Sequence, residues 1–274
     1  MALLVCGSVK GAPGVTVSAL AITSALRGHA GLLVADCDPA GGDVAARLGV
    51  PDAPGIVELA AATRTADMNG LTANRHSQGL ASGVRVLAMP AGASQAGAAM
   101  VELASLPRHP IAEVARVPGM VVVADVGRLG SGLPTRPITA ASDMVAVVVR
   151  PELDAVAHLK DALPRLRATT PRLGLVLVGR GHYQPAEVGE AAEAPVLGVL
   201  PWDRAGARLM PAAVAGNWAA SRTRLARAAF PLAAQMLDAS GEPPTVRRPQ
   251  LRTRRRRRAH MLALTRQDER KRWP

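Results

Sequence analysis

The chain has 274 residues, of which 49% are hydrophobic and only 2% aromatic, so a sizeable core must be built from Ala, Val and Leu. No uninterrupted apolar run is long enough to cross a bilayer, which argues against a helical membrane protein and for a cytoplasmic one. The net charge is +12, but residues 245–274 hold eleven arginines and one lysine against two acidic residues, so the rest of the chain is nearly neutral.

Short continuous apolar runs along the chain predict strands that are buried on both faces of a sheet. In chain order they cover residues 2–6, 31–35, 84–89, 119–124, 144–149, 173–178 and 195–199. Stretches rich in Ala and Leu lie between them and predict helices at 17–27, 43–48, 57–62, 94–106, 154–167, 186–193 and 219–237. This alternation predicts an α/β fold with one doubly wound, mostly parallel sheet and helices on both faces.

The composition changes near Gly241, where the proline-rich EPPTVRRPQ precedes five consecutive arginines, Arg254–Arg258. We therefore divide the chain into a domain at 1–240 and a basic, flexible tail at 241–274, with room for a short helix at 260–271. A segment as cationic as Arg247–Arg258 favours non-specific binding to DNA phosphates. An anionic membrane surface and an acidic protein partner are alternatives, as is a solvated segment that binds nothing.

The first predicted strand and helix are joined by a loop of small residues, SVKGAPGVTV, at positions 8–17. Gly11 and Gly14 permit a sharp turn and a close approach of a ligand to the backbone. Backbone N–H groups at a helix N-terminus, together with the helix dipole, attract anions such as phosphate. The same pattern also fits a strand–turn–helix junction that binds nothing.

Aspartates follow two of the predicted strands. Asp36, Asp38 and Asp43 come after the run at 31–35, and Asp125 follows the run at 119–124. In open parallel sheets, ligands bind at the carboxyl ends of the strands, and an aspartate there can hold Mg²⁺ through water. Any one of these residues alone would be interpreted as a helix cap or a turn aspartate, but together with the glycine loop they favour a polyphosphate site.

The motifs KG-x-x-G-x-T, DCDPAGGD, VVVADVG, SDMVAVVVRPELDAV and PVLGVLPWD follow one another in this order over residues 2–237. The order resembles that of the ParA/MinD family of deviant P-loop ATPases. This resemblance implies a P-loop NTPase-like fold, ATP and Mg²⁺ as cofactors, and a homodimer that sandwiches the nucleotide.

The resemblance also assigns roles to individual residues. The phosphate loop would comprise Gly11, Ala12, Pro13, Gly14, Val15, Thr16 and Val17. The resemblance implies that Lys10 reaches the phosphates of the partner in the dimer and that Asp38 positions the attacking water, with Asp36 as its near neighbour. Thr16, Asp38 and Asp125 would hold the metal, and Pro201 and Asp203 would lie beside the base.

Two departures from the family pattern concern the chemistry of the site. Val15 stands where relatives have a lysine that contacts the phosphates, and Gly179 stands where many have an asparagine that contacts the base. Losing one charge-assisted phosphate contact costs about 1.5–3 kcal/mol, which corresponds to roughly a tenfold to hundredfold loss of affinity. Lys10, by contrast, is one of only three lysines in a chain with thirty arginines.

Two functional hypotheses follow from the sequence. The first is a dimerising, ATP- and Mg²⁺-dependent switch that partitions or positions DNA or a cellular machine, with weak or absent hydrolysis and an unidentified protein partner. The second is a non-hydrolysing adaptor or localisation factor, for example of a pilus or secretion system. We expect a cytoplasmic location with possible recruitment to the nucleoid or to a membrane.

Overall fold

The computed structural model describes residues 1–11, 13–64, 74–170 and 172–241. The domain forms one compact unit, Met1–Pro244. Ala12 of the loop lies outside the described residues, as does the basic segment from residue 242 onward with its predicted helix at 260–271. Within the described residues, no helix has both the length and the apolar character needed to span a membrane.

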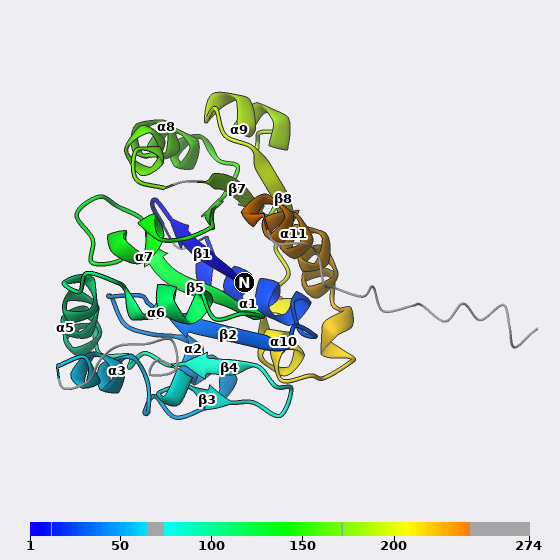
Figure 1. Cartoon of the computed structure of the whole chain (residues 1–274). Coiled ribbons are helices and arrows are strands. Elements are labelled where there is room, and N and C mark those ends of the chain that lie inside the picture. Colours follow the sequence, from blue (N-terminus) through cyan, green and yellow to red (C-terminus); the bar gives the residue numbers. More distant parts are fainter. Residues whose placement is uncertain (12, 65–73, 171, 242–274) are drawn as a thin grey trace, which may run out of the picture. The chain divides into compact units, whose positions relative to one another are not determined.

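In the described part of the chain, eight strands form one sheet in the order β3-β4-β2-β5-β1-β6-β7-β8 (Figure 1). All neighbouring strands pair in parallel except β3, which is antiparallel to β4. The strands are β1 Ala2–Ser8, β2 Gly31–Asp36, β3 Gln78–Gly79, β4 Arg85–Leu87, β5 Met120–Arg128, β6 Met144–Val149, β7 Leu173–Val178 and β8 Val196–Leu200. The predicted doubly wound, mostly parallel sheet is confirmed.

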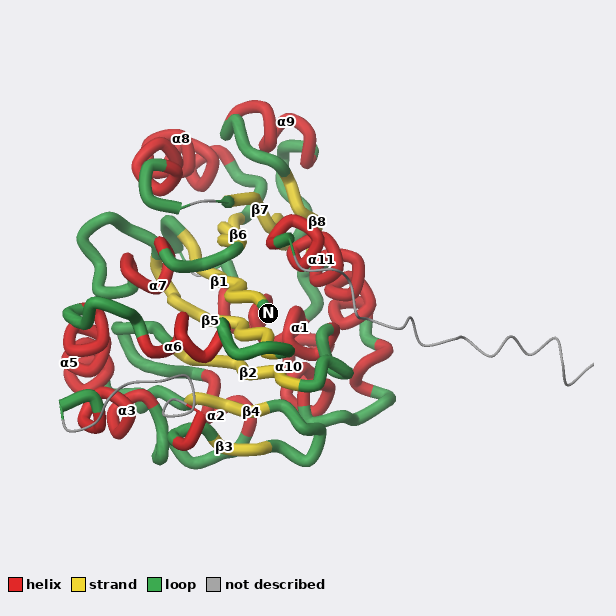
Figure 2. Tube along the Cα trace, in the orientation of Figure 1, coloured by secondary structure: helices red, strands yellow, loops and turns green. Residues whose placement is uncertain are grey.

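Helices connect the strands and cover both faces of the sheet (Figure 2). They are α1 Val15–Ala25, α2 Val44–Leu48, α3 Ile56–Ala62, α5 Ala93–Ala104, α6 Pro110–Ala115, α7 Arg136–Ala140, α8 Leu153–Arg167, α9 Pro185–Ala191, α10 Arg204–Val214 and α11 Arg224–Ser240. A 3₁₀ turn at Ala220–Arg222 precedes α11. The helix predicted at 219–237 therefore begins later than expected, because Thr223 caps α11 by accepting the Ala226 N–H at 3.2 Å.

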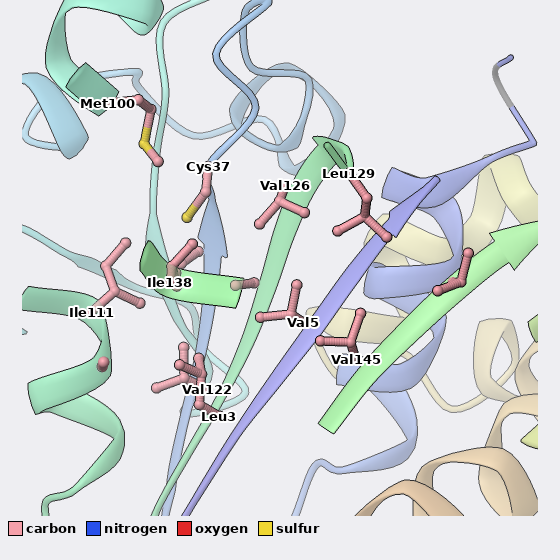
Figure 3. Packing of buried hydrophobic residues seen from close by; sticks show 14 of the residues in the cluster. Leu3, Val5, Cys37, Met100, Ile111, Val122, Val126, Leu129, Ile138 and Val145 are labelled. Carbon is pink, nitrogen blue, oxygen red and sulfur yellow. The ribbon is translucent and has the colours of Figure 1, made fainter. Parts of the chain in front are cut away.

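Alternate residues of each strand enter opposite cores. Leu3 and Val5 pack with α3, α5, α6 and α8 on one face (Figure 3), whereas Leu4 and Cys6 pack with α1, α10 and α11 on the other. Both sets are fully buried, which is why the strands are continuously apolar rather than alternating in polarity. The sheet thereby places the carboxyl ends of β2, β5 and β1 side by side, where the loop before α1 begins.

Candidate functional site

The loop between β1 and α1 is open in front of the helix. Gly11 and Gly14 have φ angles of +76° and +93°, and a Cβ placed on either would meet no heavy atom within 4 Å. Gly14 is the N-cap of α1 and no side chain caps the helix. The first N–H that bonds within the helix is that of Ser18, which donates to the Gly14 carbonyl at 2.9 Å. Among the residues that the structure describes, no acceptor bonds the preceding N–H groups of the first turn, so these groups can face a ligand.

A pocket of about 420 Å³ lies in front of this loop. Its size falls in the range of small-molecule sites. It is lined from three directions: by Ser8, Gly11, Gly14, Val15, Thr16 and Val17 of the end of β1, the loop and α1, by Asp38, Pro39, Ala40, Asp43 and Arg47 after β2, and by Gly127, Arg128 and Leu133 at and after the end of β5. The fold thus brings the described glycines of the predicted loop together with Thr16 and Asp38.

Asp125 lies directly behind Thr16 at the end of β5. It is 1% exposed, its carboxylate accepts a hydrogen bond from the Thr16 hydroxyl, and its Oδ1 accepts the Gly127 N–H at 3.0 Å. Burial raises the pKa of Asp125 to about 6, although the two hydrogen bonds oppose the shift. A nearby cation would offset this burial and favour the charged form. Asp125 is therefore placed to support a metal ion through Thr16.

Asp38 is one of two acidic residues, with Asp43, that line the pocket. Its Oδ1 accepts the Ala40 N–H at 2.8 Å, and its Oδ2 would lie 2.1 Å from a Cβ placed on Gly127. Only glycine at position 127, where φ is +59°, leaves room for this carboxylate. Partial burial raises the pKa of Asp38, while the charge of Arg128 lowers it.

Asp36 serves a structural purpose in this arrangement. Its Oδ2 accepts the Val44 N–H at 2.9 Å and its Oδ1 lies 3.5 Å from the Asp38 N–H, so its carboxyl group ties β2 to the first residue of α2. Burial, together with the charge of Asp125, raises the pKa of Asp36 to about 7. Asp36 is absent from the pocket lining and supports the loop that carries Asp38.

The residues at the pocket fit a hydrated magnesium ion better than a metal held by protein alone. Among the described residues, no three His, Cys, Asp or Glu side chains form a cluster that could hold a metal. Thr16, Asp38 and Asp125 nevertheless provide the oxygen ligands that Mg²⁺ prefers, and Mg²⁺ normally completes its shell with water and substrate phosphate oxygens. A phosphate at the N-terminus of α1 would supply those oxygens.

Lys10 points away from the pocket of its own chain. Its Nζ lies 2.7 Å from Nε2 of His158 on α8, and the residue is exposed. It is not part of the pocket lining. A role for Lys10 within its own site would require this contact to break.

A second, apolar pocket of about 110 Å³ lies beside the loop. Pro13, Gly14 and Val17 form one wall, and Leu200, Pro201, Trp202 and Asp203 contribute to the other. Asp203 is already engaged: its Oδ1 accepts the Gly206 N–H at 2.8 Å, and its Oδ2 accepts the Leu225 N–H at 3.3 Å.

Trp202 is 51% exposed, and the Arg150 guanidinium lies 4.3 Å from the centre of its ring. Pro201 and Asp203 thus line the same small pocket as Pro13 and Gly14, and their place beside a base stays a prediction. Asp203 acts first as a helix cap.

Two cations of the pocket, Arg47 and Arg128, were not among the residues that the sequence singled out. Arg47 lies 3.7 Å from Asp43 in an ion pair within α2 and its cap. Arg128 directly follows the VVVADVG motif. Its position could have been predicted, because the strand that it ends already carries Asp125 as a candidate metal ligand.

A glycine loop between the first strand and its helix, with acidic residues at the ends of the adjacent parallel strands, defines a P-loop NTPase-like α/β fold. The structure is similar to that of a ParA family ATPase from Chlorobium tepidum TLS, with 14% identity, a TM-score of 0.67, and coverage of 85% of this chain and 97% of that one. It is equally similar to the cell division ATPase MinD of Pyrococcus furiosus, with 19% identity, a TM-score of 0.67, and coverage of 86% and 98%.

The septum site-determining protein MinD of Pyrococcus horikoshii OT3, complexed with Mg-ADP, gives 16% identity, a TM-score of 0.61, and coverage of 89% and 99%. The predicted ParA/MinD fold is confirmed by these neighbours. No family model matches the sequence. The comparison with curated proteins also finds no match.

Proposed function

We propose that the chain binds a nucleoside triphosphate, most simply ATP, with Mg²⁺ in the pocket before α1. In this proposal it acts as a ParA/MinD-like switch that positions DNA or a cellular machine. The observation that carries the proposal is the open Gly11–Gly14 turn facing Asp38, with Thr16 hydrogen bonded to Asp125 behind it. A MinD structure of the same fold is complexed with Mg-ADP, which supports this choice of ligand.

Each residue has a defined part in the proposed binding mode. The uncapped N–H groups of the first turn of α1 would hold phosphate oxygens. The Thr16 hydroxyl and the carboxylates of Asp38 and Asp125 would hold Mg²⁺, which neutralises phosphate charge when bound. Asp38 is also the group that would orient a water molecule toward the terminal phosphate. The apolar slot between Val17 and Pro201 would receive part of the base.

Hydrolysis in this proposal is slow or absent because of Val15. Val15 is the first residue of α1, and its side chain is 8% exposed, packs in the core and also lines the pocket. Because the side chain is apolar, it provides no charge to a transferring phosphoryl group. Charge stabilisation is a major part of catalysis in phosphoryl transfer. Binding without turnover suits a switch whose state changes by nucleotide exchange or by contact with a partner.

Dimerisation and a polyanionic partner complete the proposal. The exposed Lys10 is placed outside its own pocket, which suits a lysine that contacts the nucleotide of a second copy. The arginines of 247–258 would bind non-specific DNA or an anionic membrane, and counterion release would drive this association. The alternative, a non-hydrolysing adaptor that has lost nucleotide binding, is favoured by Val15 and Gly179.

Thermal unfolding with ATP or ADP, each with and without Mg²⁺, tests the proposed function. We expect Mg-ATP to raise the Tm, because a ligand of the native state stabilises it, and phosphate release to stay near background. Thr16→Val should remove the Mg²⁺-dependent part of the shift relative to its own ligand-free Tm. Thr169→Val, outside the pocket, should keep that part. No shift with any nucleotide would favour the adaptor, and rapid phosphate release would contradict the proposed loss of turnover.

A further inference from the structure

We propose that Arg128 supplies the phosphate-binding cation that the loop lacks at Val15. The inference rests on the proposed function, since it assigns the partner of the polyphosphate within the same pocket. Arg128 is the last residue of β5 and pairs in register with Ser8, the last residue of β1. The Leu129 N–H donates to the Ser8 carbonyl at 2.9 Å, which fixes this junction beside the start of the glycine loop.

The side chain of Arg128 is exposed and lines the pocket together with Gly11, Gly14 and Thr16. Among the described residues, its guanidinium takes part in no hydrogen bond and no ion pair within 4.0 Å; only its backbone carbonyl is engaged, 3.5 Å from the Thr135 hydroxyl. An arginine that faces a polar pocket without a partner can turn toward a ligand without breaking a contact.

The other cation of the pocket is in a different situation. Arg47 lies on the opposite wall and is paired with Asp43 at 3.7 Å, so its charge is largely balanced. Asp38 then remains as a negative group that a magnesium ion would neutralise. A magnesium-bound triphosphate still carries net negative charge, and Arg128 is the pocket cation left to meet it.

The chemistry of arginine suits this position better than that of a lysine at the same place. A guanidinium presents a planar fork of donors that binds two phosphate oxygens at once, and it stays charged at all relevant pH values. Val15 occupies the first position of α1 and reaches the pocket from the helix side, whereas Arg128 approaches from the neighbouring strand. The cation would thus have moved from the loop to the adjacent strand end while the phosphate position stayed the same.

Isothermal titration calorimetry with Mg-ATP and with magnesium tripolyphosphate, which has no base, tests the assignment. We expect Arg128→Ala to weaken both ligands by roughly tenfold to hundredfold, and Arg128→Lys to recover part of the loss. Arg208→Ala removes an exposed arginine of α10 outside the pocket and should leave both affinities unchanged. The Tm of ligand-free Arg128→Ala should equal that of the wild type, because the side chain has no partner to lose.

The double variant Val15→Lys with Arg128→Ala provides a rescue test and should regain affinity relative to Arg128→Ala. Unchanged binding by Arg128→Ala would overturn the assignment while leaving the proposed function intact. Absence of Mg-ATP binding by the wild type would overturn both, so the two failures are distinguishable. Equal losses in Arg128→Ala and Arg208→Ala would also overturn it, since they would indicate a general effect of net charge.

Discussion

At the scale of single residues, Val15 determines the chemistry expected of the pocket. It is nearly buried at the start of α1, yet it lines the pocket with Thr16 and Val17. A lysine introduced here can keep its stem against the core and extend its ammonium group into the open space before the helix. The position is therefore suited to restoring a loop cation.

We expect Val15→Lys to raise the affinity for Mg-ATP about tenfold or more, because it adds a charge-assisted contact to phosphate. The variant should also unfold at a slightly lower temperature, since a buried apolar side chain is replaced by a charged one. Calorimetry and thermal unfolding measure the two effects. Val101→Lys adds the same charge at an exposed site on α5 and should change neither. Equal affinities of Val15→Lys and the wild type would argue that phosphate does not bind before α1.

Part of the pocket was predictable from residue types alone. Gly11, Gly14, Thr16 and Asp38 do line one pocket, with Asp125 behind Thr16, because the carboxyl ends of adjacent parallel strands meet at one edge. Lys10 instead contacts His158, a residue far along the sequence.

Arg128 was missed for the same reason as the Lys10 contact. Its pairing with Ser8 joins residues about 120 positions apart. Such a pairing follows from the register of the strands, which cannot be predicted from the sequence alone.

At the scale of elements, Asp203 joins two helices at their N-termini. Its two carboxylate oxygens accept the Gly206 N–H of α10 and the Leu225 N–H of α11. Loss of such a cap typically costs about 0.5–2 kcal/mol of stability. The segment also lines the small apolar pocket beside Gly14, so a change here couples helix position to the shape of that pocket.

We expect Asp203→Ala to lower the free energy of unfolding by about 1–2 kcal/mol, because two backbone donors lose their acceptor. Urea denaturation monitored by circular dichroism measures the loss. Asp203→Asn should keep part of the stability, since its one remaining oxygen still accepts a hydrogen bond. A variant with unchanged stability but lost nucleotide affinity would contradict the capping role and indicate a direct contact with the ligand.

The elements themselves were predicted unevenly from the sequence. The buried parallel strands were found within a few residues, because each is a continuous apolar run between polar turns. Helices α6, α7 and α10 were missed: α6 and α7 are short and begin with proline, and Gly206 and Pro211 interrupt the pattern of α10. The longer α8 and α11 were predicted in spite of their internal prolines. The two-residue strand β3 is too short to leave a pattern at all.

At the scale of the whole molecule, the two parts of the chain differ in charge. Ten of the twelve net positive charges belong to residues 245–274, and the compact unit Met1–Pro244 is close to neutral. A nearly neutral domain with a nucleotide pocket and a strongly cationic segment suits a switch in which one part responds to ligand and the other binds a polyanion.

The central claim is that a magnesium-bound polyphosphate lies at the N-terminus of α1. A crystal structure of the full chain with Mg²⁺ and a non-hydrolysable ATP analogue tests it most directly. The account predicts phosphates against the backbone of Gly11–Thr16, magnesium beside the Thr16 hydroxyl and Asp38, and the Arg128 guanidinium on a phosphate oxygen. An empty pocket at saturating ligand, or an analogue bound elsewhere on the molecule, would contradict it.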